Sequence, residues 1–475
     1  MVDLMILHGT LLTMDIQRRI IYDGAIAIEK GRIFDIGTTT ELNSKYNARR
    51  IIDASRKVIM PGLIDTHGHA GHSLIKTVAE NVGDDWVSIV ENFYKEGTTP
   101  DYWYIDGKLA ALERLKFGVT CGVSYLGSCA RTDDPIYGIK HCEGVSKIGI
   151  RDILALGPGR PPYPNKYVEW KGNVSKEVYA SFERNLEVTE DIIQKVKKLN
   201  HRIDCTMSPP SITIGSLTKD GRVRDLPDVE EKVEAMKHVI EKWNLKLHCH
   251  AYSPQIKFAA DKLDLLGPHV SLVHCTGLLK EEIHILAKTD TKVCHAPSAR
   301  SIIPIQCPVV ELLDAGVTVS IATDGSSPDR TFDLFKELRM AMTIHRTFFK
   351  DESFMPPGKV LEMVTVDAAK TLGYENDLGS LELGKKADII IIDMMKPHLV
   401  PFFMIPQRVA YEVSGQDVET VIVEGEILME NSSVKKVNEN SILESAQEEA
   451  ENAIARGQLE KYLEIPKGFW GKSRY

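Results

Sequence analysis

Short apolar runs alternate with amphipathic stretches along the middle of the chain. Stretches in which an apolar residue recurs every three or four positions, such as 229–243 and 280–287, predict helices. Between them lie apolar runs of strand length. Alternation of buried strands with helices is typical of a parallel sheet that helices cover. The predicted strands are 61–65, 119–124, 153–157, 204–208, 245–250, 270–275, 291–295 and 317–324.

The number and spacing of these strands predict the α/β class and a (β/α)8 TIM barrel. Both ends of the chain show a different pattern, with short strands and glycine turns in 4–59 and again in 387–393 and 418–428. Neither end is large enough to be stable alone, so we expect both to form one small β-sandwich domain. The predicted organisation is 1–58 and 379–436 for this domain, 59–378 for the barrel and 437–475 for a helical and aromatic tail.

Composition narrows the possible partners. The chain has 475 residues and a net charge of -9, and its 43% hydrophobic and 26% charged content excludes bulk disorder. An acidic chain argues against nucleic acid and against an acidic membrane surface as partners. No apolar run reaches the ~20 residues that span a bilayer. We therefore expect a small-molecule substrate, with no nucleic acid and no membrane.

The cysteines and the N-terminus indicate where the protein works. Eight cysteines occur without any Cys-x-x-Cys pair, a pattern that favours free thiols in a reducing compartment. The first residues carry no basic segment before an apolar run, so we see no signal peptide. The expected location is the cytoplasm.

Several predicted barrel strands end in a residue that can bind a metal ion. Active sites of parallel barrels lie at the carboxyl ends of the strands. Residues two apart on a strand share a face, so His67 and His69 can hold one ion together. Imidazole nitrogen and carboxylate oxygen suit Zn²⁺ and also Fe²⁺. The strand-end residues are His67, His69, His248, His250, His274, His295 and Asp324.

An ordered set of motifs then resembles a known family. The stretch 60–69 reads Met-Pro-Gly-Leu-Ile-Asp-Thr-His-Gly-His, and Val-His-Cys (273–275), Cys-His-Ala-Pro-Ser (294–298) and Ala-Thr-Asp-Gly-Ser-Ser (322–327) follow it. Together with 379–389, these motifs resemble the amidohydrolase superfamily over the chain before Glu439. Within it, the sequence is most similar to the branch of s-triazine hydrolases and methylthioadenosine/S-adenosylhomocysteine deaminases.

The resemblance implies a metal centre with one divalent ion. His67, His69, His250 and Asp324 are the implied ligands, with Zn²⁺ favoured and Fe²⁺ as the alternative. No lysine ends a barrel strand to bridge a second ion, so we expect a mononuclear site. The family also implies a homo-oligomer, either a dimer or a tetramer.

Three residues receive catalytic roles from the same resemblance. Asp324 would accept the proton of a water that the ion activates, and His274 would polarise the substrate or hold that water. His295 would line the pocket or support the developing anion.

The substrate pocket departs from the family pattern. Deaminases of this branch read His-x-x-Glu after the third metal ligand, and that glutamate moves a proton, but here the position is Ser253. Arg300 stands where relatives often have asparagine, and it could pair with an anionic or carbonyl-rich substrate or face solvent. Trp86 and Trp103 could stack on a planar ligand, although packing also explains them.

The expected activity is metal-dependent hydrolysis of a C–N bond in a small, planar, nitrogen-containing substrate. Because Ser253 replaces the glutamate, an amidase, a urea-type hydrolase and a dehalogenating hydrolase remain open alternatives. A metal-bearing relative without catalysis is a further alternative from another functional class.

Overall fold

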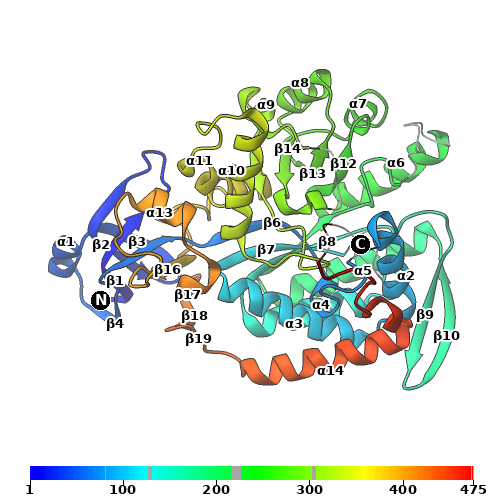
Figure 1. The fold of residues 1–475 in the computed structure, drawn as a ribbon, viewed down its shortest axis with the longest axis horizontal. Helices are drawn as coiled ribbons and strands as arrows, with labels where there is room; N and C mark the ends of the chain where they lie inside the picture. The colour runs from blue at the N-terminus through cyan, green and yellow to red at the C-terminus, as the bar shows by residue number, and fades with distance from the viewer. Residues whose placement is uncertain (81, 127–130, 216–225, 302–305, 472, 474–475) are drawn as a thin grey trace.

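The central sheet of the computed structural model is a parallel barrel of eight strands (Figure 1). The structure describes residues 1–80, 82–126, 131–215, 226–301, 306–471 and 473. Just after the last strand, the Asp324 N–H donates to the His67 carbonyl (2.9 Å), which joins the two ends of the sheet. The predicted fold class is confirmed. In chain order the strands are β6 (Leu63–His69), β7 (Val119–Tyr125), β8 (Arg151–Leu156), β11 (Ile203–Met207), β12 (Leu247–Tyr252), β13 (Val270–Thr276), β14 (Lys292–His295) and β15 (Val319–Ile321).

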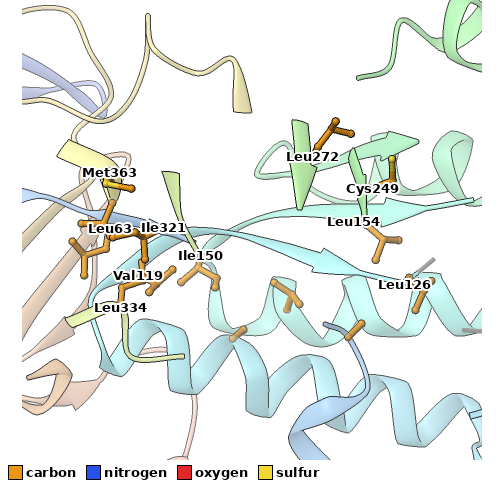
Figure 2. Close-up of a cluster of buried hydrophobic side chains, with 14 of the residues drawn as sticks. Leu63, Val119, Leu126, Ile150, Leu154, Cys249, Leu272, Ile321, Leu334 and Met363 are labelled. Carbon is orange, nitrogen blue, oxygen red and sulfur yellow. The ribbon is translucent and has the colours of Figure 1, made fainter. Parts of the chain in front are cut away.

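Helices cover the outside of the barrel, and apolar side chains fill the layer between helices and strands. Figure 2 shows part of this layer, where Leu154, Cys249 and Leu272 are buried between strands and helices. Cys249 alternates along β12 with the inward His248 and His250, so its thiol faces the helices. The helices are α2 (Trp86–Gly97), α3 (Pro100–Lys116), α4 (Ile136–Ile148), α5 (Phe182–Leu199), α6 (Leu226–Trp243), α7 (Gln255–Phe258), α8 (Lys280–Thr289), α9 (Val309–Asp314), α10 (Leu334–Phe349), α11 (Pro357–Met363) and α12 (Val366–Leu372).

The two ends of the chain share a second sheet of nine strands, drawn in blue and orange in Figure 1. Strand β16 pairs antiparallel with β5, so Ile390 lies opposite Met60 and joins the late segment to the early one. Isoleucine and leucine side chains from both segments form its buried core. Its strands are β1 (Val2–Leu12), β2 (Ile20–Glu29), β3 (Arg32–Thr38), β4 (Ala48–Asp53), β5 (Lys57–Pro61), β16 (Ile389–Asp393), β17 (Val418–Val423), β18 (Glu426–Glu430) and β19 (Ser433–Val434), with α1 (Thr39–Lys45) and α13 (Ile405–Tyr411) beside them.

Two further elements lie outside these sheets. A hairpin of β9 (Asn165–Lys171) and β10 (Val174–Ala180) follows β8, and the sequence analysis did not predict it. Helix α14 (Glu439–Gly457) runs along α2 and α3. Among the described residues, no helix combines the length and the apolar character needed to cross a bilayer.

Candidate metal centre and active site

Four predicted ligands converge at the carboxyl end of the barrel. One donor atom each from His67, His69, His250 and Asp324 lies within 4.8 Å of all the others. The Nε2 atoms of His67 and His69 are 3.3 and 3.2 Å from Asp324 Oδ1. The structure thus brings together residues that are up to 257 positions apart, from 67 to 324.

The donors of this cluster fit a cation. His67 Nδ1 is 2.8 Å from His248 Nε2, and His248 Nδ1 is 2.8 Å from Ser271 Oγ. When His67 donates from Nδ1, its Nε2 carries a lone pair that faces the Asp324 carboxylate. This Nε2 is buried and has no hydrogen-bond partner within the described part of the chain. Two acceptors that face each other in a buried site repel, and a divalent ion between them removes that repulsion.

Burial sets protonation states that suit a metal ion. It lowers the pKa of His67 to about 3 and also lowers the pKa of His250 and of His274. Burial works to raise the pKa of Asp324, but His274 and the Arg330 guanidinium outweigh it and hold that pKa well below its usual range. Neutral imidazoles and an ionised carboxylate are the forms that bind metal.

Unusual backbone conformations orient the side chains of His274 and Asp324. His274 and Asp324 both have positive φ angles, 69° and 61°, which non-glycine residues seldom adopt. After Ala251 pairs with His274, Tyr252 pairs with Thr276, so β13 carries an extra residue there. Such bulges redirect side chains next to active sites. His274 Nε2 consequently lies 3.9 Å from Asp324 Oδ1, close enough to act on the same substrate.

His295 lies at the end of β14 but has another neighbour. Its Nε2 is 3.4 Å from Nε2 of His345, a buried residue of α10. His345 Nδ1 in turn is 2.9 Å from the Gln306 side chain. The role of His295 in the pocket stays a prediction, and its neighbour His345 was not among the predicted site residues.

The predicted substrate-binding residues are placed differently from one another. Ser253 follows β12 and is partly exposed. The Trp86 indole donates to the Val78 carbonyl (3.2 Å), and its ring lies against His72. Trp103 is fully buried and donates to the Thr98 hydroxyl (3.1 Å), which makes it part of the core. The side chain of Arg300 is outside the described part of the structure.

His72, to which the sequence analysis gave no role, lies in the wall of the metal centre. Its ring stacks on His69 with centroids 4.5 Å apart and planes 4° apart. A Cβ on Gly325 would come within 2.6 Å of His72 Nδ1, so only glycine fits beside it. A histidine three positions after a metal ligand was the available sequence signal.

A buried ion network supports the centre from behind, and the sequence did not reveal it. Asp65 accepts hydrogen bonds from the backbone N–H and the hydroxyl of Thr323, the residue before Asp324. The Arg114 guanidinium lies 3.2 Å from Asp65 and 3.4 Å from Asp152. Because Asp65 is two residues before His67, this network ties two strands that carry ligands to each other.

We expect His248→Ala to weaken zinc binding about 10- to 100-fold, because His67 then loses the partner that orients it. Zinc dissociation constants from competition with a chromophoric chelator measure this. His238→Ala, on the exposed face of α6, is the control and should leave the constant unchanged. Equal zinc affinities in the parent, in His248→Ala and in His238→Ala would show that His248 does not orient His67.

The comparison with known proteins agrees with this geometry. The sequence pattern of the amidohydrolase family matches residues 58–428, most of the chain. The chain belongs to the amidohydrolase family. The superfamily named from the motifs is thereby confirmed, and the protein is an enzyme, a metal-dependent hydrolase that acts on C–N bonds other than peptide bonds.

Relatives of this amidohydrolase include named deaminases. A 5'-deoxyadenosine deaminase of Methanosarcina acetivorans is 30% identical over 472 residues, covering 96% of this chain and 99% of the relative. A 5-methylthioadenosine/S-adenosylhomocysteine deaminase of Syntrophobacter fumaroxidans is 26% identical over 452 residues, covering 93% and 96%. The solved structure of atrazine chlorohydrolase TrzN from Arthrobacter aurescens, complexed with zinc, has a TM-score of 0.79 at 21% identity, covering 94% and 100%.

Proposed function

We propose that this amidohydrolase uses Zn²⁺, held by His67, His69, His250 and Asp324, to release ammonia or a small amine from a planar nitrogen heterocycle. The observation that carries the proposal is the convergence of these four donors, one of which, His67 Nε2, is buried and makes no hydrogen bond among the described residues. The names of the relatives make adenine nucleosides the first substrates to try.

Different side chains would act on the attacking water and on the substrate. His67, His69, His250 and Asp324 would hold the ion, which when bound would supply a water of lowered pKa. Asp324, whose pKa lies well below its usual range, would accept the proton of the attacking water. His274, which lies over the same carboxylate, holds the substrate atom on which negative charge develops. The product of this hydrolysis is a carbonyl compound and an amine.

The test is ammonia release by zinc-loaded protein from 5'-deoxyadenosine, 5'-methylthioadenosine, S-adenosylhomocysteine, guanine and amino-triazines. We expect at least one of them to be turned over, activity to fall at least about 100-fold after the ion is removed with a chelator, and Zn²⁺ to restore it. Reloading with Fe²⁺ compares the two ions directly. Full activity in protein whose metal content is near zero would refute the proposal.

Ser253 supports a second candidate, hydrolysis of a bond whose leaving group needs no carboxylic acid from β12. A hydroxyl does not give up a proton at neutral pH as a carboxylic acid does, so an amide, a urea-type compound or a chlorinated heterocycle is a suitable substrate class. Chloride release and amide cleavage, assayed on the same protein, separate this candidate from the first. Ammonia release from an amino-heterocycle at a higher kcat/KM would exclude it.

We further propose a cytoplasmic homo-oligomer. Among the described residues seven cysteines are free and all are buried, as suits a reducing compartment. Large apolar side chains are exposed on α10 and on the segment that enters α13, among them Phe348 (61%), Phe403 (71%) and Met404 (68%). Light scattering of the purified protein distinguishes a dimer or tetramer from a monomer.

A further inference from the structure

Tyr252 points into the barrel mouth beside the metal centre. It ends β12, two residues after His250 and four after His248. Alternate residues of a strand share a face, and His248 and His250 both face inward, since they contact His67. Tyr252 therefore projects from the same face, one step closer to the mouth, and it stays partly exposed there.

The tyrosine ring completes a stack with two histidines of the site. The His274 ring lies over His250 at 5.2 Å with planes 10° apart, and over Tyr252 at 5.9 Å with planes 16° apart. The bulge in β13 that aims His274 also sets this stack. The backbone N–H of Tyr252 donates to Gln255 Oε1 (3.2 Å), which anchors the strand end. The phenol thus has a defined direction before any ligand binds.

The hydroxyl of this tyrosine is available to a ligand. Among the described residues, the structure shows a hydrogen bond from the backbone N–H of Tyr252 and none from its hydroxyl. A phenol with its ordinary pKa near ~10 keeps its proton at neutral pH and is therefore a donor there. Phenol hydroxyls at the edge of a site usually have a partner, and here a substrate atom is the one that remains.

We propose that the Tyr252 hydroxyl contacts the substrate and donates a hydrogen bond to one of its nitrogen or oxygen atoms, next to a position where Ser253 supplies no carboxylic acid. The inference rests on the proposed function for the reaction, but its contact with a ligand at the metal centre is testable without turnover.

This contact restricts the class of substrate. A phenol has an ordinary pKa near ~10, against ~4.3 for a glutamate, so it donates a hydrogen bond and keeps its proton. The favoured substrate has an acceptor atom beside the carbon under attack and a leaving group that departs without a proton from β12. Analogues without that acceptor leave the hydroxyl unpaired and are disfavoured.

The test compares Tyr252→Phe with the full-length, zinc-loaded parent. The probe is acetohydroxamate, a small zinc chelator whose oxygens are acceptors, and its affinity is measured by calorimetry. Loss of one neutral hydrogen bond should weaken binding about three- to tenfold, with zinc content unchanged. For the best substrate of the ammonia-release panel, kcat/KM should fall about tenfold.

Tyr374→Phe is the matched control, because it removes a hydroxyl that bonds to Asp204 (2.9 Å) outside the metal centre. It should change neither the hydroxamate affinity nor turnover by more than about twofold. An unchanged hydroxamate affinity in Tyr252→Phe would overturn the inference, whatever the substrate panel shows. A weakened affinity with an inactive panel would support the contact and refute the proposed aminohydrolase reaction, so the two failures are distinct.

Discussion

Replacing Asp324 with alanine is expected to remove both the metal ion and the activity. Asp324 is the one carboxylate in the four-residue cluster; of the histidines around it, His67 is buried and His69 and His250 are partly buried. Without it, three imidazoles and no negative charge face the ion, and the proposed proton acceptor for the water is lost as well. We expect zinc to drop from about one ion per chain to below about a tenth, and kcat/KM to fall at least about 10³-fold.

Two further variants make this result specific. Asp324→Asn keeps the size of the side chain and removes its charge, so it should behave like alanine if the charge is what binds the ion. Asp351→Ala changes an exposed carboxylate in the turn after α10 and should retain the parent's zinc and activity. Elemental analysis after dialysis and the ammonia assay measure both quantities. An Asp324→Ala protein with a full complement of zinc and normal turnover would contradict the assigned ligand set.

The sequence predicted the barrel because short, mostly apolar runs of strand length alternate with helical patterns along its middle. It predicted the candidate site for a related reason: polar residues at the ends of such strands meet at one mouth. His67 and Asp324 are far apart in the chain, yet strand alternation and the family motifs were enough to place them together. The roles of these residues toward a substrate remain predictions.

Two features that the sequence analysis did not predict have a local signal in the sequence. Gly172 and Asn173 form a two-residue turn between two runs of strand length, a usual mark of a hairpin, and β9 and β10 pair across it. Tyr252 lies at every second position of β12 together with His248 and His250, so the sequence already indicated that its side chain points inward.

Other features had no local signal at all. The contact between Asp65 and Arg114 joins residues 49 positions apart, on a strand and a helix, and nothing in either segment indicates it. The pairing of His295 with His345 depends likewise on how α10 packs against β14. Tertiary contacts of this kind follow from packing, which a period of two or of 3.6 residues does not encode.

The glycine between two metal ligands becomes understandable from the structure. Gly68 separates His67 from His69 and faces away from the ion. A Cβ at this position would come within 2.4 Å of the Arg114 guanidinium, and one at Gly122 would come within 2.8 Å of it. Both strands therefore have a glycine, which has no side chain, where the Arg114 guanidinium packs against them. In the His-Gly-His sequence, the two histidines face the proposed ion on one side and the glycine accommodates Arg114 on the other.

Arg114→Met should be strongly destabilising. The guanidinium is 1% exposed, lies 4.3 Å from the Phe332 ring and donates to the Ser124 hydroxyl and the Val123 carbonyl. Methionine fills much of the space but leaves the carboxylates of Asp65 and Asp152 buried without a counter-charge. Breaking a buried pair in this way typically costs about 3–5 kcal/mol of unfolding free energy. Lys116→Met, on the same helix with a partly exposed ion pair to Glu439, should cost less than about 1 kcal/mol.

The loss of unfolding free energy in Arg114→Met should also depend on pH in a defined direction. Burial raises the pKa of both Asp65 and Asp152, and Arg114 opposes that rise. Without Arg114 the folded-state pKa values climb further above those of the unfolded chain, so the folded protein holds protons that the unfolded chain releases. Stability then falls as pH increases, and the deficit of Arg114→Met should be larger at pH 8 than at pH 5. Urea unfolding of the parent and of Arg114→Met at both pH values measures this deficit. A deficit that is equal at both pH values, or larger at pH 5, would show that Arg114 does not hold the two carboxylates in their charged form.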